Sequence, residues 1–96
     1  MKQIKIKNQS LIDYMESLSY EVAARRDVIT FMLANQMDTN SAQFKAYHKE
    51  YLEFFAELET AKGQLEKDYV LPNATGPVTW SLDYGTATLT IKEKAT

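Results

Sequence analysis

His48 is the only histidine in a chain of 96 residues that contains no cysteine. A metal site built on it would need carboxylates such as Glu50 or Glu53, and helical spacing puts neither on the face of His48. Histidine suits acid–base chemistry near neutral pH, but here it lies within an apolar stripe. We interpret His48 as a helix-surface or interface residue and expect no metal-ligating residue.

The hydroxyl side chains and the glycines show no arrangement typical of catalysis. Serines and threonines are plentiful, but without a second histidine or a partnered lysine no activated nucleophile is evident. Gly63, Gly76 and Gly85 are isolated, so the sequence contains no glycine-rich phosphate cradle. We predict that the protein is not an enzyme, with no catalytic residue, no cofactor and no cofactor-binding residue.

Arg25 interrupts an apolar stripe and therefore needs a polar partner. Glu21 lies four residues earlier, and such a helical pair contributes a few tenths of a kcal/mol when exposed. Alternatively, Arg25 reaches Glu53 or Glu57 on the second long segment, or an acidic group on another chain. There its planar guanidinium would fix the register of the contact. Both interpretations are open from sequence.

Composition is that of a soluble globular chain, with 45% hydrophobic and 25% charged residues. We expect a single domain over residues 1–96. A net charge of −2 argues against a nucleic-acid binder, which usually carries a basic excess. No apolar run approaches the roughly 20 residues of a membrane span. The lack of cysteine favours a cytoplasmic location or one within a phage particle.

Hydrophobic periodicity predicts two helices of nearly equal length, separated by a polar break and flanked by short alternating strands. Ser10 and Ser41 are the expected N-caps of the helices. The N-terminal strand is rich in lysine, which suits a sheet edge. The predicted elements are a strand at 2–7, helices at 10–36 and 42–69, and a β-hairpin at 78–83 and 86–92.

The connection within the predicted β-hairpin can be tested against the apolar pattern. A two-residue turn at Tyr84-Gly85, or a four-residue loop over 83–86, pairs Leu82 with Ala87 and Trp80 with Leu89. Two isolated strands are marginal, and equal helices return the chain to its first strand. We therefore predict an α+β fold of order β-α-α-β-β, with a long antiparallel helical hairpin and a small three-stranded antiparallel sheet.

Aromatic residues gather in the middle and outer half of the predicted helical hairpin, and they exceed what two helices can bury between them. The sheet folding back, a second copy forming a four-helix arrangement, or a different protein would cover them. We predict an interaction or assembly protein, either a homo-oligomer or a binder of a protein partner. By analogy of size and composition alone, we expect a structural or accessory component of a bacterium or a phage. The interface candidates are Phe31, Phe44, Tyr47, Tyr51, Phe54 and Arg25.

An alternative function is binding of a small molecule or nucleotide in a pocket between the sheet and the helices. Trp80 or Tyr84 would stack on a ring, and Arg26 or Arg25 would bind an anion. A third possibility is a nucleic-acid contact through the lysines of the first strand, which the net charge disfavours.

Overall fold

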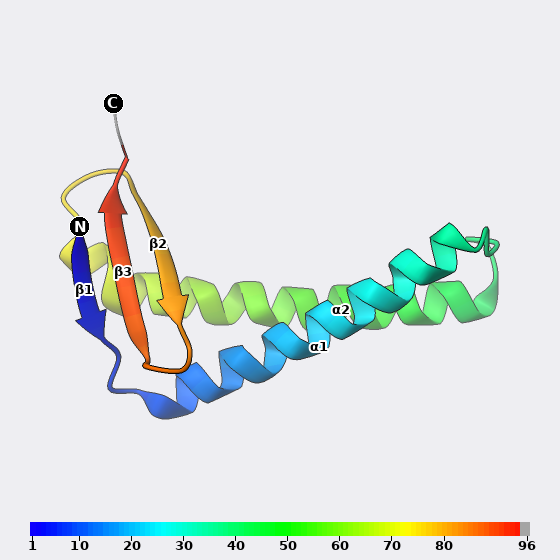
Figure 1. The fold of residues 1–96 in the computed structure, drawn as a ribbon, viewed down its shortest axis with the longest axis horizontal. Helices are drawn as coiled ribbons and strands as arrows, with labels where there is room; N and C mark the ends of the chain where they lie inside the picture. Colours follow the sequence, from blue (N-terminus) through cyan, green and yellow to red (C-terminus); the bar gives the residue numbers. More distant parts are fainter. Residues whose placement is uncertain (95–96) are drawn as a thin grey trace. The chain divides into compact units, whose positions relative to one another are not determined.

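The computed structural model describes residues 1–94 and has the predicted α+β architecture. The described chain divides into two compact units. The base unit contains Met1–Glu16 and the chain from Ala61 onward, and the hairpin unit is Ser17–Thr60. The strands and α-helices are β1 (Lys2–Lys5), α1 (Gln9–Ala34), α2 (Ala42–Leu65), β2 (Val78–Asp83) and β3 (Thr88–Glu93) (Figure 1).

The sheet of the base unit has the order β1-β3-β2, and both pairings are antiparallel. The strand at the N-terminus therefore pairs with the last strand, and β1 lies at a sheet edge, as predicted. Beyond β1, the N–H of Ile6 donates to the carbonyl of Ala87 at 2.8 Å. The buried apolar residues of this unit are Ile6, Ile12, Met15, Ala61, Leu65, Val70, Ala87, Leu89 and Ile91.

The predicted register of the β-hairpin is wrong by two residues. Leu82 pairs with Leu89, and Trp80 pairs with Ile91, so the loop spans residues 84–87. Within this loop the carboxylate of Asp83 accepts the backbone N–H groups of Gly85 at 2.9 Å and Thr86 at 3.3 Å. A shift of two residues leaves every apolar side chain on its face, so alternation could not reveal it.

The helix starts are set by side-chain caps. α1 begins at Gln9, because the side-chain oxygen of Asn8, rather than of Ser10, accepts the N–H of Leu11 at 3.2 Å. Ser41 caps α2 as predicted, and its hydroxyl accepts the N–H of Phe44 at 3.2 Å.

α1 ends at Ala34, two residues before the predicted end, in a Schellman turn. The N–H of Met37 donates to Met32 at 2.9 Å, and that of Gln36 donates to Leu33 at 3.0 Å. This closure requires a left-handed residue, which is Gln36 with φ of 58°. A non-glycine residue therefore occupies a position that favours glycine.

The helical path after α2 changes its winding instead of continuing to residue 69 as an α-helix. A π turn covers Glu66–Val70, and a 3-10 turn covers Leu71–Asn73. Pro72 cannot donate a backbone hydrogen bond, which limits further helix. The π turn carries Glu66, whose carboxylate accepts the indole N–H of Trp80 at 3.0 Å.

Replacing a core leucine of the base unit should show how much this packing contributes. We expect Leu65→Ala to lower the free energy of unfolding by about 2–5 kcal/mol, because the fully buried side chain leaves a cavity. The exposed Leu71→Ala should change it by less than about 0.5 kcal/mol. Urea unfolding followed by circular dichroism measures both, and equal losses would contradict the assigned core.

The left-handed residue after α1 gives a stabilising substitution. Gln36→Gly should raise the free energy of unfolding by about 0.5–1 kcal/mol, because the left-handed strain that glycine removes exceeds the extra conformational entropy that glycine loses on folding. Asn35→Gly, one residue earlier, is the matched control and should not stabilise. A loss of stability in Gln36→Gly under the same urea titration would argue against the Schellman closure.

Candidate interaction surface

Arg25 is the centre of a polar cluster between α1 and α2 within the hairpin unit. Its guanidinium forms an ion pair with Glu21 and donates to the Glu21 carbonyl at 3.3 Å. A second nitrogen, Nη2, lies 2.7 Å from Oε1 of Glu50. The guanidinium carbon lies 4.1 Å from the centroid of the Phe54 ring, in cation–π geometry. Arg25 therefore joins the two helices.

The electrostatics of Arg25 follow from these partners. Its pKa is raised from the ordinary value, mainly by the hydrogen bond to Glu50 and further by Glu21, against an opposing desolvation effect. Its Nε is buried and has no hydrogen-bond partner among residues 1–94. Both terminal nitrogens are engaged with carboxylates, so Arg25 acts as a contact between helices within the hairpin unit.

The partner of Arg25 on α2 is Glu50 rather than the expected Glu53 or Glu57. Glu50 precedes Phe54 by one helical turn, so its carboxylate and the aromatic ring flank one position on the facing helix. Glu53 instead lies 3.9 Å from Lys49 on its own helix. Which glutamate of α2 binds Arg25 depends on the axial position of α2 along α1, and the sequence pattern does not give that position.

His48 belongs to a ladder of rings along α2. It stacks on Phe44 with centroids 5.9 Å apart, and it lies 6.5 Å from the Tyr51 ring. Tyr51 in turn lies 6.0 Å from Phe55. Within residues 1–94 no group of three acidic, histidine or cysteine residues is placed to hold a metal ion.

The predicted interface residues do not form one exposed patch. Phe44 is only 8% exposed and belongs to the core of the hairpin unit. Tyr51 and Phe54 are half-buried, and Arg25 covers Phe54. Phe31 is 68% exposed, and Tyr47 is also exposed.

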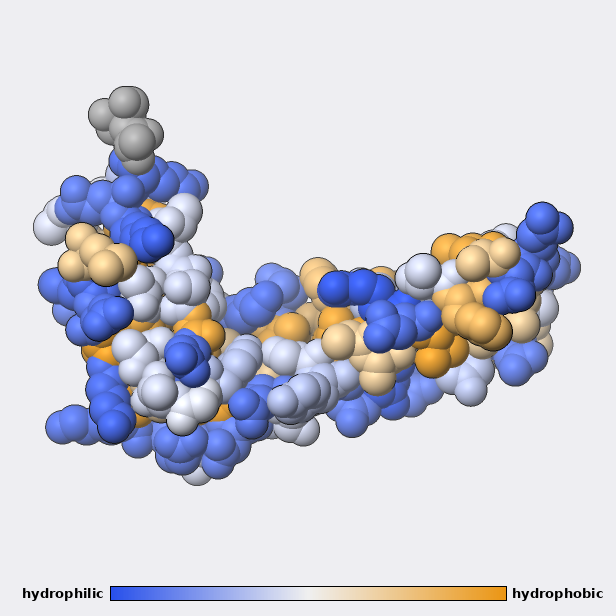
Figure 2. All heavy atoms as spheres, in the orientation of Figure 1, coloured by the Kyte–Doolittle hydropathy of each residue, from blue (hydrophilic) through white to orange (hydrophobic). Residues whose placement is uncertain are grey.

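The hairpin unit instead exposes a different set of apolar side chains, and Figure 2 shows hydrophobic residues at the surface near the end where α1 and α2 are joined. Tyr20 and Phe31 are eleven residues apart, which places them on one row of α1. The interface candidates from the sequence do not include Leu52. The available signal was a large apolar side chain turned away from the buried row of α2, which contains Phe44 and Leu58. The exposed large apolar residues of this unit are Tyr20, Val28, Phe31, Leu33, Tyr47, Leu52 and Phe55.

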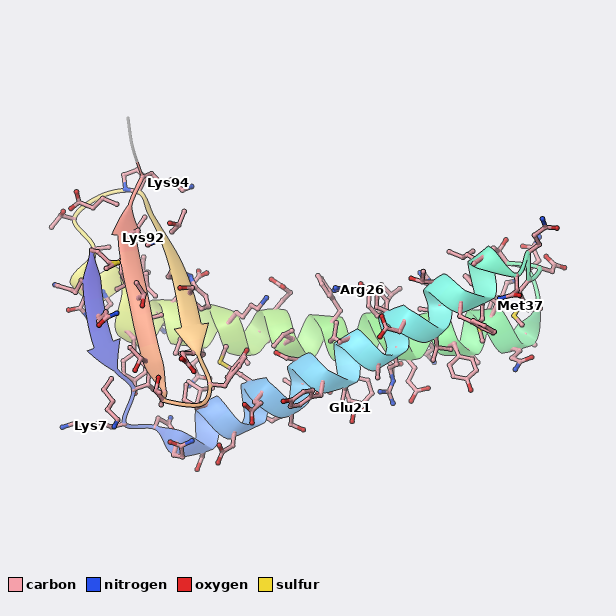
Figure 3. The ribbon with its side chains drawn as sticks, in the orientation of Figure 1. Lys7, Glu21, Arg26, Met37, Lys92 and Lys94 are labelled. Carbon is pink, nitrogen blue, oxygen red and sulfur yellow. The ribbon has the colours of Figure 1, made fainter. Side chains whose placement is uncertain are left out.

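The residues of the alternative ligand pocket, Arg26, Trp80 and Tyr84, do not all belong to one unit. Arg26 is exposed in the hairpin unit, where it points away from Glu21 (Figure 3). Trp80 and Tyr84 belong to the base unit. Trp80 lines a depression of about 230 Å³ beside Glu66, and Tyr84 does not line it. This volume is below the roughly 300–1,000 Å³ of typical ligand pockets.

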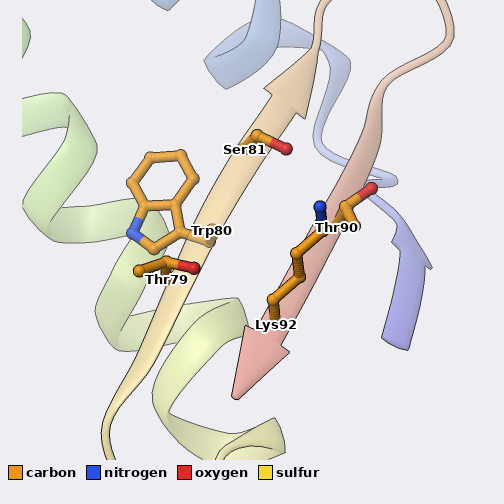
Figure 4. A pocket seen from close by; sticks show the side chains of 5 residues that line it. All are labelled: Thr79, Trp80, Ser81, Thr90 and Lys92. Carbon is orange, nitrogen blue, oxygen red and sulfur yellow. The ribbon is translucent and has the colours of Figure 1, made fainter. Parts of the chain in front are cut away.

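A second depression lies on the polar face of β2 and β3. Thr79 and Ser81 on β2 are paired with Lys92 and Thr90 on β3, and their side chains line about 150 Å³ together with Trp80 (Figure 4). One lysine and three hydroxyls supply no acid–base pair, so this face offers polar contacts without evident catalytic chemistry.

Comparison with known proteins adds no relationship, since no family model, no curated protein and no solved structure matches the chain. None of the helices in residues 1–94 is both long enough and apolar enough to cross a membrane.

The Arg25 cluster can be tested with its neighbour as a control. Arg25→Ala should lower the unfolding midpoint, because the Glu21 and Glu50 carboxylates and the Phe54 ring all lose a partner. Arg26→Ala removes an equal side chain from an exposed position and should have the smaller effect. Thermal unfolding at low ionic strength compares them. A larger loss in Arg26→Ala would contradict the assigned role of Arg25.

Proposed function

We propose that this protein is a non-enzymatic assembly protein that self-associates through the exposed apolar surface of its hairpin unit. The observation that carries the proposal is the balance of burial in that unit. Its buried apolar residues are Leu18, Val22, Met32, Phe44 and Leu58. The seven exposed large apolar residues named above outnumber them.

Two helices offer each other only one stripe apiece, and each exposed side chain in water forgoes the stabilisation that burial would give. Tyr20, at 70% exposed, and Phe31 illustrate this on α1. A second hairpin supplies part of the missing cover, as in a four-helix arrangement. Tyrosine and phenylalanine are also enriched at protein interfaces.

The lack of cysteine supports an intracellular setting for this assembly, in the cytoplasm or inside a phage particle. Binding of a small molecule or nucleotide is less favoured, because Arg26, Trp80 and Tyr84 are divided between the two units and the depressions beside Trp80 are small.

Self-association predicts a concentration-dependent mass and melting temperature. At about 100 μM the chain should sediment as a dimer or larger species, and its melting temperature should rise with protein concentration. The double variant Phe31→Asp/Leu52→Asp should shift the equilibrium to monomer while keeping its helical circular dichroism signal. A wild-type chain that stays monomeric at this concentration would overturn the proposed function.

A further inference from the structure

We infer that the partner of α2 is a second copy of the same helix, packed antiparallel across a two-fold axis near Leu52. This inference rests on the proposed function and specifies the surface that self-association uses. We call this surface the α2 outer face, and it consists of Lys45, Lys49, Leu52, Glu53, Phe55 and Glu59, all exposed within the hairpin unit.

The apolar centre of the α2 outer face is Leu52. At about 100° per residue, Leu52 is turned roughly 120° around the helix from the buried Leu58. It is accordingly 49% exposed, in the middle of a polar surface. Phe55 lies three residues further, on the next turn, and is also exposed. Together they offer the next helix an apolar contact at the midpoint of the hairpin part of α2.

The charges of the α2 outer face are segregated on the two sides of Leu52. Lys45 and Lys49 precede it, and Glu53 and Glu59 follow it. Lys49 and Glu53 are already 3.9 Å apart, with side chains 80% and 62% exposed, so both can reach a neighbouring chain. The acidic Glu50 does not disturb this order, because it is bound to Arg25 beside α1.

This order is complementary to itself only when the second helix runs in the opposite direction. In a two-fold antiparallel pair, one edge of the first helix lies against the same edge of the second helix, and the residues along the two edges run in opposite order. Lys49 then faces Glu53 of the second copy, and Lys45 faces Glu59 of the second copy, while Leu52 meets Leu52. In a parallel pair each lysine would face a lysine, and each glutamate a glutamate, which is repulsive.

Charge reversal tests this arrangement without changing the apolar contact. Lys49→Glu and Glu53→Lys alone should each raise the dimer dissociation constant at least about tenfold. The double variant Lys49→Glu/Glu53→Lys should recover wild-type dimerisation, because complementarity is restored and the helix keeps an i,i+4 pair. Sedimentation equilibrium measures all four proteins, and additive losses in the double variant would overturn the inference.

Mixing the wild type with the double variant distinguishes the two orientations. In an antiparallel mixed dimer, lysine would face lysine and glutamate would face glutamate, so mixed dimers should be disfavoured. In a parallel mixed dimer, opposite charges would meet and mixed dimers would prevail. Native mass spectrometry of one isotopically labelled chain counts the species, and an excess of mixed dimers would overturn the antiparallel arrangement.

Phe31 provides the matched control for Leu52, because it lies on the outer row of α1 and is more exposed. Leu52→Asp should raise the dissociation constant roughly a hundredfold, since it places two charges at the centre of the interface. Phe31→Asp should change it less than about threefold. Because the chain has no cysteine, Leu52→Cys should also form an intermolecular disulfide, whereas Phe31→Cys should not.

The outcomes separate this inference from the proposed function. A wild-type dimer that Phe31→Asp disrupts and Leu52→Asp leaves intact would overturn the α2 arrangement while supporting self-association through the hairpin unit. A wild-type monomer at about 100 μM would overturn both.

Discussion

The pairing of β3 with both neighbouring strands is the constraint on which the base unit depends. β3 is the central strand, and β1 and β2 both bond to it. A two-stranded hairpin alone would be marginal in water, so the sheet needs the strand from the other end of the chain. α1 and α2 contain 26 and 24 residues. Their near equality returns the chain to the sheet, where Leu89 and Ile91 are buried.

In the hairpin unit, the two terminal nitrogens of Arg25 have carboxylate partners, whereas its buried Nε has none among residues 1–94. Arg25 binds Glu21 and Glu50 and covers Phe54, which sets how α1 meets α2 in this unit. Such a contact favours one register over others, whereas apolar contacts tolerate sliding. Seven large apolar side chains of this unit are exposed, and the proposed self-association rests on them.

Several features could be predicted because they depend on short-range physics. The strand at the N-terminus, the two long helices and the C-terminal β-hairpin follow from periodicity. The Ser41 cap follows from the need of the first helical N–H groups for an acceptor. Of the interface candidates, Phe31 is exposed and Phe44 is buried. Helical stripes show which residues share a face, but they do not show how far the facing helix covers that face.

The sequence by itself determined the order of the elements, the alternation that separates the faces of the sheet, and the segregation of charge about Leu52. Only the tertiary structure decided that Trp80 pairs with Ile91, because a two-residue slip preserves every face. It also decided that Arg25 binds Glu50, because a long side chain reaches several carboxylates and only the axial position of the facing helix selects one. Local patterns depend on residues that are neighbours in the chain, whereas a register depends on the contacts between two segments that are distant in the sequence.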